Sequence, residues 1–160
     1  MPRPSAIKVA SSLPFVLAEK IACEVLRIAG EEDLAPLTVA VLDSGGHLVS
    51  FKREDGCGIV RADIALGKAW GALGMGLSSR KLRDALGDRL AFQNAIAAAS
   101  GGRFIPVPGG VLILNADGLA IGAVGVSGDS SECDEYAAIA AIRAAGLAPD
   151  PAEPHPQWKD

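Results

Sequence analysis

The sequence has few aromatic residues and no long apolar run. Aromatic side chains make up 4% of its 160 residues, so a core has to be built mainly from Val, Leu, Ile and Ala. No stretch of about 18 apolar residues occurs, and the first residues lead into no apolar region of the kind that signal peptides carry. These absences predict neither membrane insertion nor secretion, and we expect a cytoplasmic protein.

Clustered positive charge and cysteine pairs are missing as well. The net charge is -4, and no basic stripe with interleaved aromatic residues appears, which argues against a nucleic-acid-binding protein. Cys23, Cys57 and Cys133 are odd in number and widely separated, which favours reduced thiols over a disulfide framework. The chain contains no CxxC, GxSxG, HExxH or GxxxxGK[S/T] motif, so nothing indicates a zinc knuckle, a serine hydrolase, a zinc protease or a P-loop.

Apolar residues and glycines are abundant instead. Hydrophobic residues make up 49% of the chain, and 19 residues are glycine. A domain this small and this apolar exposes part of its apolar area unless a second subunit covers it. We therefore expect a homo-oligomer.

Periodicity places helices and hairpins along the chain. Apolar residues at helical spacing predict helices over residues 13–29, 60–75 and 132–145, a short helix ending at residue 86, and further turns over 90–99. Short β-branched segments separated by turn residues predict two hairpins, 37–42 with 47–53 and 111–114 with 119–126. Tight hairpins force antiparallel neighbours, so we expect a single α+β domain (α/β by broad class) with a mainly antiparallel sheet of two hairpins and flanking helices.

Boundaries and caps follow from the same pattern. Residues 1–12 are expected to form an N-terminal extension, residues 13–147 the domain, and residues 148–160 a loose Pro-rich tail. Gly30 stands where the first helix would end. Ser131, with Asp134 three residues later, is nearly a capping box for the last helix.

The turn from Asp43 to His47 brings a carboxylate and an imidazole close together in the sequence. His47 is a candidate metal or heme-iron ligand, or a general base near neutral pH. The alternative is an exposed histidine at the start of a strand, because Asp and Gly are common turn formers. His155, the other histidine, lies in the tail.

Two glycine-rich segments are candidate binding surfaces. In Pro106–Gly110 the prolines stiffen the chain, and Gly109 and Gly110 allow a ligand to approach the backbone; the alternative is a rigid connection into an edge strand. Residues 125–134 run from a strand through a polar loop into a helix, where backbone N–H groups would favour an anion and Ser127, Ser130 and Ser131 could help to bind a carboxylate or phosphate. Helix capping is the favoured explanation of this second segment.

Charged and sulfur-containing residues near the second helix complete the candidates. Asp63 and Lys68 are five residues apart, about 140° around a helix, so each is expected to face a different partner. Cys57 lies between glycines and is more readily a bystander than a reactive thiol. Met75 is expected in the core rather than as an axial ligand.

Five segments together resemble the GlcG/HbpS family, which includes the C-terminal domain of PduO-type proteins. The resemblance as a whole covers residues 13–147. The five segments follow in this order: VAVLDSGGHLV (39–49), REDG (53–56), IALGKA (64–69), PVPGGV (106–111), and IGAVGVSG (121–128) with Glu132 and Asp134.

The resemblance implies an α/β fold with an antiparallel sheet, homo-oligomers that are often octamers, and binding of heme or related tetrapyrroles in several members. Family positions that look pocket-forming correspond to His47, Asp63, Lys68, Gly109, Gly110, Glu132 and Asp134, and Pro108 next to Gly109 is a further candidate for ligand binding. Three departures stand out: no histidine precedes His47, Cys57 replaces the usual Ala, and Gly76–Ser79 replaces Gly-x-Pro-[Ser/Thr].

Three functional hypotheses remain at this point. The first is an oligomeric protein that binds heme or a related tetrapyrrole, with His47 as the candidate iron ligand. The second is a small cofactor-independent enzyme, an isomerase, hydratase or lyase, acting on a carboxylate-bearing metabolite through Lys68, Asp63, Glu132 and His47. The third is a structural or regulatory oligomer without a pocket.

Overall fold

The protein was analysed as a computed structural model that describes residue 1 and residues 3–160. Its helices are α1 (Phe15–Glu31), α2 (Val60–Met75), α3 (Ser79–Leu86), α4 (Leu90–Ala99) and α5 (Ser131–Ala144). Its strands are β1 (Thr38–Asp43), β2 (Leu48–Arg53), β3 (Gly110–Leu114), β4 (Ala120–Ser127) and β5 (Ala148–Asp150). None of the helices in this described part is long and apolar enough to cross a membrane.

The strands form one antiparallel sheet in the order β2-β1-β4-β3-β5. The two predicted hairpins, β1-β2 and β3-β4, are both present and join through β1 and β4. The predicted α+β class with a mainly antiparallel sheet is therefore confirmed. Short turns between the paired strands fix this arrangement, because two neighbouring strands joined by only a few residues must be antiparallel.

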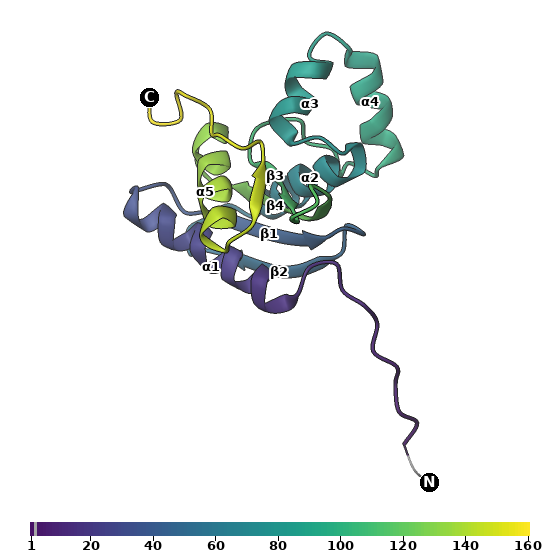
Figure 1. Cartoon of the computed structure of the whole chain (residues 1–160). Coiled ribbons are helices and arrows are strands. Elements are labelled where there is room, and N and C mark those ends of the chain that lie inside the picture. Colours follow the sequence, from purple (N-terminus) through teal and green to yellow (C-terminus); the bar gives the residue numbers. More distant parts are fainter. Residues whose placement is uncertain (2) are drawn as a thin grey trace.

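Helices cover both faces of the sheet (Figure 1). Ile21 and Val25 of α1, with Ile139 of α5, pack on Val39 and other valines of the central strands in the main core. A second, smaller core lies on the opposite face. There α2 packs on β1, β3 and β4 through Leu42, Ala69, Ala72, Leu112 and Ala123.

Glycines let α2 approach the sheet very closely. A Cβ atom on Gly125 would lie 1.8 Å from the carbonyl oxygen of Ala65, and one on Gly110 would lie 2.3 Å from that of Lys68. Backbone cannot move aside as a side chain can, so these positions require glycine. The close packing fixes α2, and with it the residues that α2 presents to the surface.

Two predicted helix ends are wrong. Helix α1 continues through Gly30 to Glu31, and the N–H of Glu32 donates to Ile28 O. Helix α5 is capped by Ser130, whose Oγ accepts from Cys133 N. The third residue of α5 is therefore Cys133, and the capping box expected from Ser131 and Asp134 does not form.

The C-terminal residues are packed on the domain, so the expectation of a loose tail is also wrong. Strand β5 pairs with β3, and the ring of Trp158 stacks on Tyr136 with ring centroids 3.5 Å apart. The Sγ of Cys133 donates to Trp158 O. Strand β5 and Trp158 therefore hold this segment on the domain, although its prolines had suggested disorder.

Candidate functional site

The candidate site is a hollow of about 390 Å³ between the start of β2, one side of α2 and the turn after α4. Its walls are mostly apolar, with one acidic and one basic side chain. This volume lies at the lower end of the range for small-molecule pockets. The lining residues are Leu42, Gly46, Leu48, Asp63, Leu66, Trp70, Gly101, Gly102 and Arg103.

Arg103 supplies the positive charge of the hollow. Its guanidinium carbon lies 4.2 Å from the centre of the Trp70 ring, and its Nε donates to Ser100 O at 2.9 Å. Gly101 and Gly102 adopt positive φ angles of 64° and 84°, which side-chain-bearing residues rarely adopt. This turn brings the arginine from the end of α4 back over α2, where the cation–π contact stabilises its position.

A narrower apolar groove of about 220 Å³ lies between α2 and α4, on the other side of Trp70. Met75 lines this groove and is 38% exposed, so its predicted place in the core is wrong. The end of α2 explains the difference, because Gly74 and Gly76 next to it carry no side chain that could cover it.

His47 lies between two residues that line the hollow, Gly46 and Leu48. Its side chain is 82% exposed, and its Nδ1 lies 3.3 Å from Asp43 Oδ1. The same carboxylate oxygen accepts hydrogen bonds from the N–H groups of Gly45 and His47. The turn therefore orients an imidazole that is open to solvent, on a residue whose two neighbours in the sequence line the hollow.

Lys68 and Asp134 meet in the interior and not in the hollow. Nζ of Lys68 donates to Asp134 Oδ2 at 2.9 Å and to Val126 O at 2.8 Å, and the two side chains are 2% and 1% exposed. The other carboxylate oxygen of Asp134 accepts from Asp129 N. Burial lowers the pKa of Lys68 and raises the pKa of Asp134, while the attraction between the two groups opposes both shifts.

The predicted Pro108-Gly109-Gly110 wall covers this ion pair. All three residues are buried. Gly109 adopts a φ of 117°, and a Cβ atom there would lie 2.8 Å from Lys68 Nζ. The N–H of Gly110 donates to Ser79 Oγ at 2.7 Å. The geometry thus gives these glycines a packing role, and direct contact with a ligand stays a prediction.

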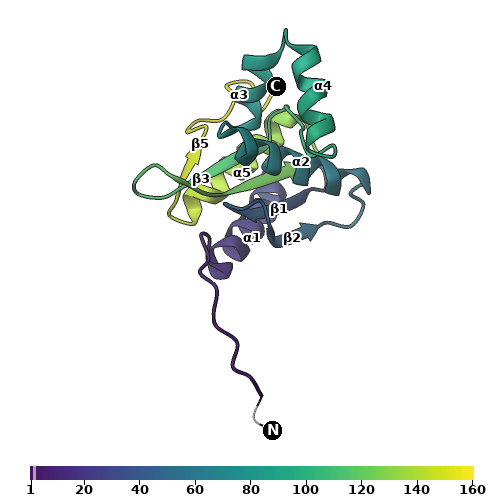
Figure 2. The same ribbon diagram turned by 90° about the vertical axis from the view of Figure 1, so that its right-hand side faces the viewer.

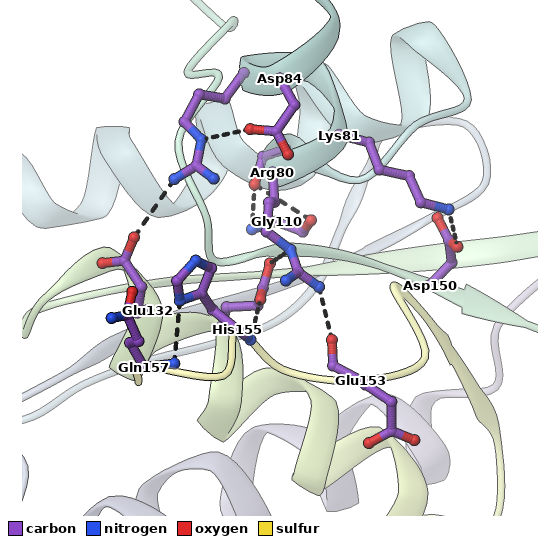
Figure 3. Close-up of polar contacts among 12 residues, drawn as sticks. Arg80, Lys81, Asp84, Gly110, Glu132, Asp150, Glu153, His155 and Gln157 are labelled. Atoms are coloured by element: carbon purple, nitrogen blue, oxygen red, sulfur yellow. Dashed lines mark hydrogen bonds and ion pairs between the residues drawn. The ribbon is translucent and has the colours of Figure 1, made fainter. Parts of the chain in front are cut away.

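Glu132 lies elsewhere, at the start of α5, where its Oε1 is 3.4 Å from Arg83 Nη1 of α3 (Figure 3). Asp63 lines the hollow without Lys68. The four candidate acid–base groups thus have separate surroundings, and the structure brings together only Lys68, Asp134 and the Gly109-Gly110 segment. Among the described residues, no group of three or more His, Cys, Asp or Glu side chains is placed to hold a metal ion.

A buried carboxylate that the sequence patterns did not identify, Glu135, lies beneath the C-terminal tail. Oε1 of Glu135 accepts from His155 N at 3.2 Å. Nε of Arg80 lies 3.2 Å from Oε2, but the angle does not make a hydrogen bond, so Oε2 has no donor within the described residues. Burial raises the pKa of Glu135 to about 7.

The missed residues of the hollow carried only weak signals. Trp70 and Leu66 fit the apolar stripe of a helix, which indicates core and not a site. Arg103 follows a Gly-Gly pair, a turn signal that gives no direction for the side chain. Glu135 lies beside Asp134 in a polar stretch, where an exposed carboxylate is the usual expectation.

Comparison with known proteins identifies similar chains over nearly the whole length. The model of a family described as "Haem degrading protein HbpS-like" matches residues 13–143. An uncharacterized 15.0 kDa protein in the dhaT-dhaS intergenic region of Citrobacter freundii is 32% identical over 139 residues, which cover 82% of this chain and 91% of the relative.

Solved structures show the same fold. A PduOC:heme complex has a TM-score of 0.74 at 25% identity and covers 85% of this chain and 96% of its own. The Klebsiella pneumoniae protein ORFY has a TM-score of 0.76 at 24% identity, covering 91% of this chain and 98% of its own. For HbpS the values are 0.71 and 22%, covering 90% and 97%.

Proposed function

The chain belongs to the HbpS-like family, and from this premise we propose that it binds heme or a related tetrapyrrole in the hollow beside Trp70. The observation that carries the proposal is the combination of apolar walls with one arginine. A tetrapyrrole such as heme has a flat apolar ring system and carboxylate side chains. The walls suit the ring, and Arg103 suits a carboxylate.

The residues of the hollow fit such a ligand in three ways. Leu42, Leu48 and Leu66 offer an apolar surface, and Trp70 offers an aromatic one. Arg103 is fixed by its contact with Trp70 and presents a cation. The similar chain of the PduOC:heme complex, at 25% identity, supports the ligand class.

His47 is the proposed iron ligand. An Nδ1–H directed at Asp43 would leave Nε2 of the imidazole with a free lone pair, which is the form that binds a metal. Its exposed side chain, next in the sequence to two residues that line the hollow, leaves room for an iron atom carried by a bound ring. A bound heme would supply the iron chemistry, and the protein residues would orient the ring.

The hollow alone encloses only part of a tetrapyrrole, so we propose that a second copy of the chain completes the site. The buried pair of Lys68 and Asp134 would act at a distance, by holding α2 and therefore Asp63, Leu66 and Trp70 in position. In this proposal Gly109, Gly110 and Pro108 support α2 from below.

Titration of the purified protein with hemin tests the proposal. We expect a shift of the Soret band that saturates at a fixed stoichiometry, and we expect His47→Ala to abolish the shift. His155→Ala is the matched control, because His155 is the only other histidine and lies in the C-terminal tail. Saturable binding that is equally insensitive to both substitutions would rule out His47 as the ligand, and absence of saturation would rule out the function.

A further inference from the structure

The two edges of the sheet are protected very differently. Strand β5 has three residues, includes Pro149, and is followed by the buried Pro151, so it offers little to a further strand. Strand β2 has six residues, and no strand formed by the described residues pairs with its outer edge. Natural proteins rarely leave such an edge uncovered.

Strand β2 also exposes apolar side chains to solvent. Leu48 pairs with Leu42, and Phe51 pairs with Ala40, which places both on the face that α2 covers elsewhere. Helix α2 lies over β1, β3 and β4 but leaves this strip open. Leu48 is consequently 52% exposed and Phe51 40% exposed.

The N-terminal arm, residues 3–11, is the second uncovered apolar feature. Ile7 and Val9 are 92% and 90% exposed, and in an extended chain they point to the same side, with Lys8 on the other. The base of the arm is fixed, because Ser44 N donates to Ser12 Oγ and Leu13 is buried. Figures 1 and 2 show the arm running away from the domain.

We propose that the arm of one copy adds as an antiparallel strand to the free edge of β2 in a second copy. Pairing Ile7 with Phe51 places Val9 beside Leu48 when the arm follows the register shift that β1 also follows, Val41 with Ser50 and then Leu42 with Leu48, so the two apolar strips cover each other. The backbone N–H and C=O groups of both segments then gain partners. Two such contacts related by a two-fold axis would form a closed dimer in which the arms are exchanged.

Charges agree with this register. The arm carries Arg3 and Lys8 and no acidic residue up to Ser12. Pairing Ile7 with Phe51 places Lys8 opposite Ser50, whose hydroxyl already donates to Glu19. Beyond the end of β2 at Arg53, the same register directs Arg3 toward the turn that contains Asp55. No like charges therefore stand directly opposite one another along the strand.

A second copy fits better than the arm's own β2. The arm leaves the domain at the β1-β2 turn, where Ser12 is held by Ser44, and its direction is away from the sheet (Figure 2). To reach its own edge it would have to reverse sharply within three residues of this anchor. An extended arm of nine residues reaches roughly 30 Å, which is enough to cross to a neighbouring molecule.

Disulfide trapping between two differently tagged copies tests the exchange. The native cysteines are first replaced (Cys23→Ser, Cys57→Ser, Cys133→Ser), and a copy with Ile7→Cys is co-expressed with a copy with Phe51→Cys. Oxidation is expected to convert most of the protein that carries both tags into a covalent heterodimer. Leu119→Cys in place of Phe51→Cys is the control, since Leu119 is exposed but lies on the β3-β4 turn, and it is expected to give none.

Two outcomes of the same experiment would contradict the exchange between copies. A chain carrying both Ile7→Cys and Phe51→Cys that closes on itself, while the two separate copies stay uncoupled, would overturn the exchange in favour of the arm's own β2. Absence of any disulfide would overturn the contact altogether.

Molar mass in solution gives an independent test. Ile7→Asp with Val9→Asp is expected to weaken self-association at least tenfold, whereas Ala6→Asp with Ala10→Asp adds the same charge on the opposite side of the extended arm and should leave it within twofold. Equal weakening by both pairs would contradict a contact made through the apolar side of the arm.

Discussion

Lys68 on α2 donates through Nζ to Asp134 on α5, at 2.9 Å and almost completely out of contact with water. The same ammonium group donates to Val126 O at the end of β4. One side chain therefore links helices on opposite faces of the sheet, next to the end of the strand between them. The five-residue separation of Asp63 and Lys68 had indicated different surroundings, and in the structure Lys68 pairs with Asp134 while Asp63 lines the hollow.

Removing one member of this pair is expected to destabilise the protein strongly. Lys68→Met leaves a buried carboxylate without its cation, and Asp134→Leu leaves a buried ammonium, and such single changes cost about 3–5 kcal/mol. Denaturant unfolding followed by circular dichroism measures the free energy of unfolding of each variant.

The double variant, Lys68→Met with Asp134→Leu, is the informative control. It removes both charges together, so its loss is expected to be smaller than that of either single variant. Additive losses would show that the two side chains do not act as a pair.

The buried Glu135 is expected to make stability depend on pH. Its pKa is about 7 in the folded protein against an ordinary value of 4.5, so between these values the folded state holds a proton that the unfolded state releases. The free energy of unfolding should therefore decrease as the pH rises from 4.5 to 7, by on the order of 3 kcal/mol for this group. Unfolding curves across this range measure the slope.

Glu135→Gln should remove this part of the slope. Glu132→Gln is the matched control, because it removes the same charge from the same helix at a side chain that is 30% exposed. An unchanged slope in Glu135→Gln, or the same change in both variants, would argue against a protonated buried carboxyl group.

Two glycine substitutions should have opposite effects. Gly125→Ala places a methyl group against the carbonyl of Ala65 and should destabilise the protein by several kcal/mol, because α2 must move away from the sheet. Gly30→Ala meets no atom within 4 Å and lies inside a helix, so it should stabilise by roughly 0.5–1 kcal/mol. Thermal unfolding of both variants checks the contrast, and a neutral Gly125→Ala would contradict the close packing of α2.

Most of the fold could be predicted because its signals are local. Apolar periodicity located α2 and α5, and turn residues such as Asp43–Gly46 located the hairpins. The sequence did not predict β5, since a three-residue strand that contains proline has no local signal and forms by pairing with β3. Nor could the end of α1 be read from Gly30, because glycine ends a helix only where the chain needs the left-handed conformation there.

The site was harder to predict because its residues come together only through tertiary packing. Three residues predicted from the sequence to line a pocket lie instead in the interior. They are Lys68, Gly109 and Asp134. The residues that form the hollow, Leu66, Trp70 and Arg103, come from a helix stripe and a turn after α4. No spacing along the chain reveals that Arg103 lies over Trp70, and Asp63 alone of the predicted residues lines the hollow.

The affinity for hemin of a variant with an altered hollow tests the central claim most directly. Leu66→Glu places a carboxylate on the apolar wall and is expected to weaken hemin binding at least about tenfold, equivalent to 1.4 kcal/mol. Leu119→Glu makes the same change at an exposed leucine outside the hollow and should bind like the wild type. Equal affinity of the two variants, with the fold of both verified by circular dichroism, would contradict the proposal that the hollow beside Trp70 is the binding site.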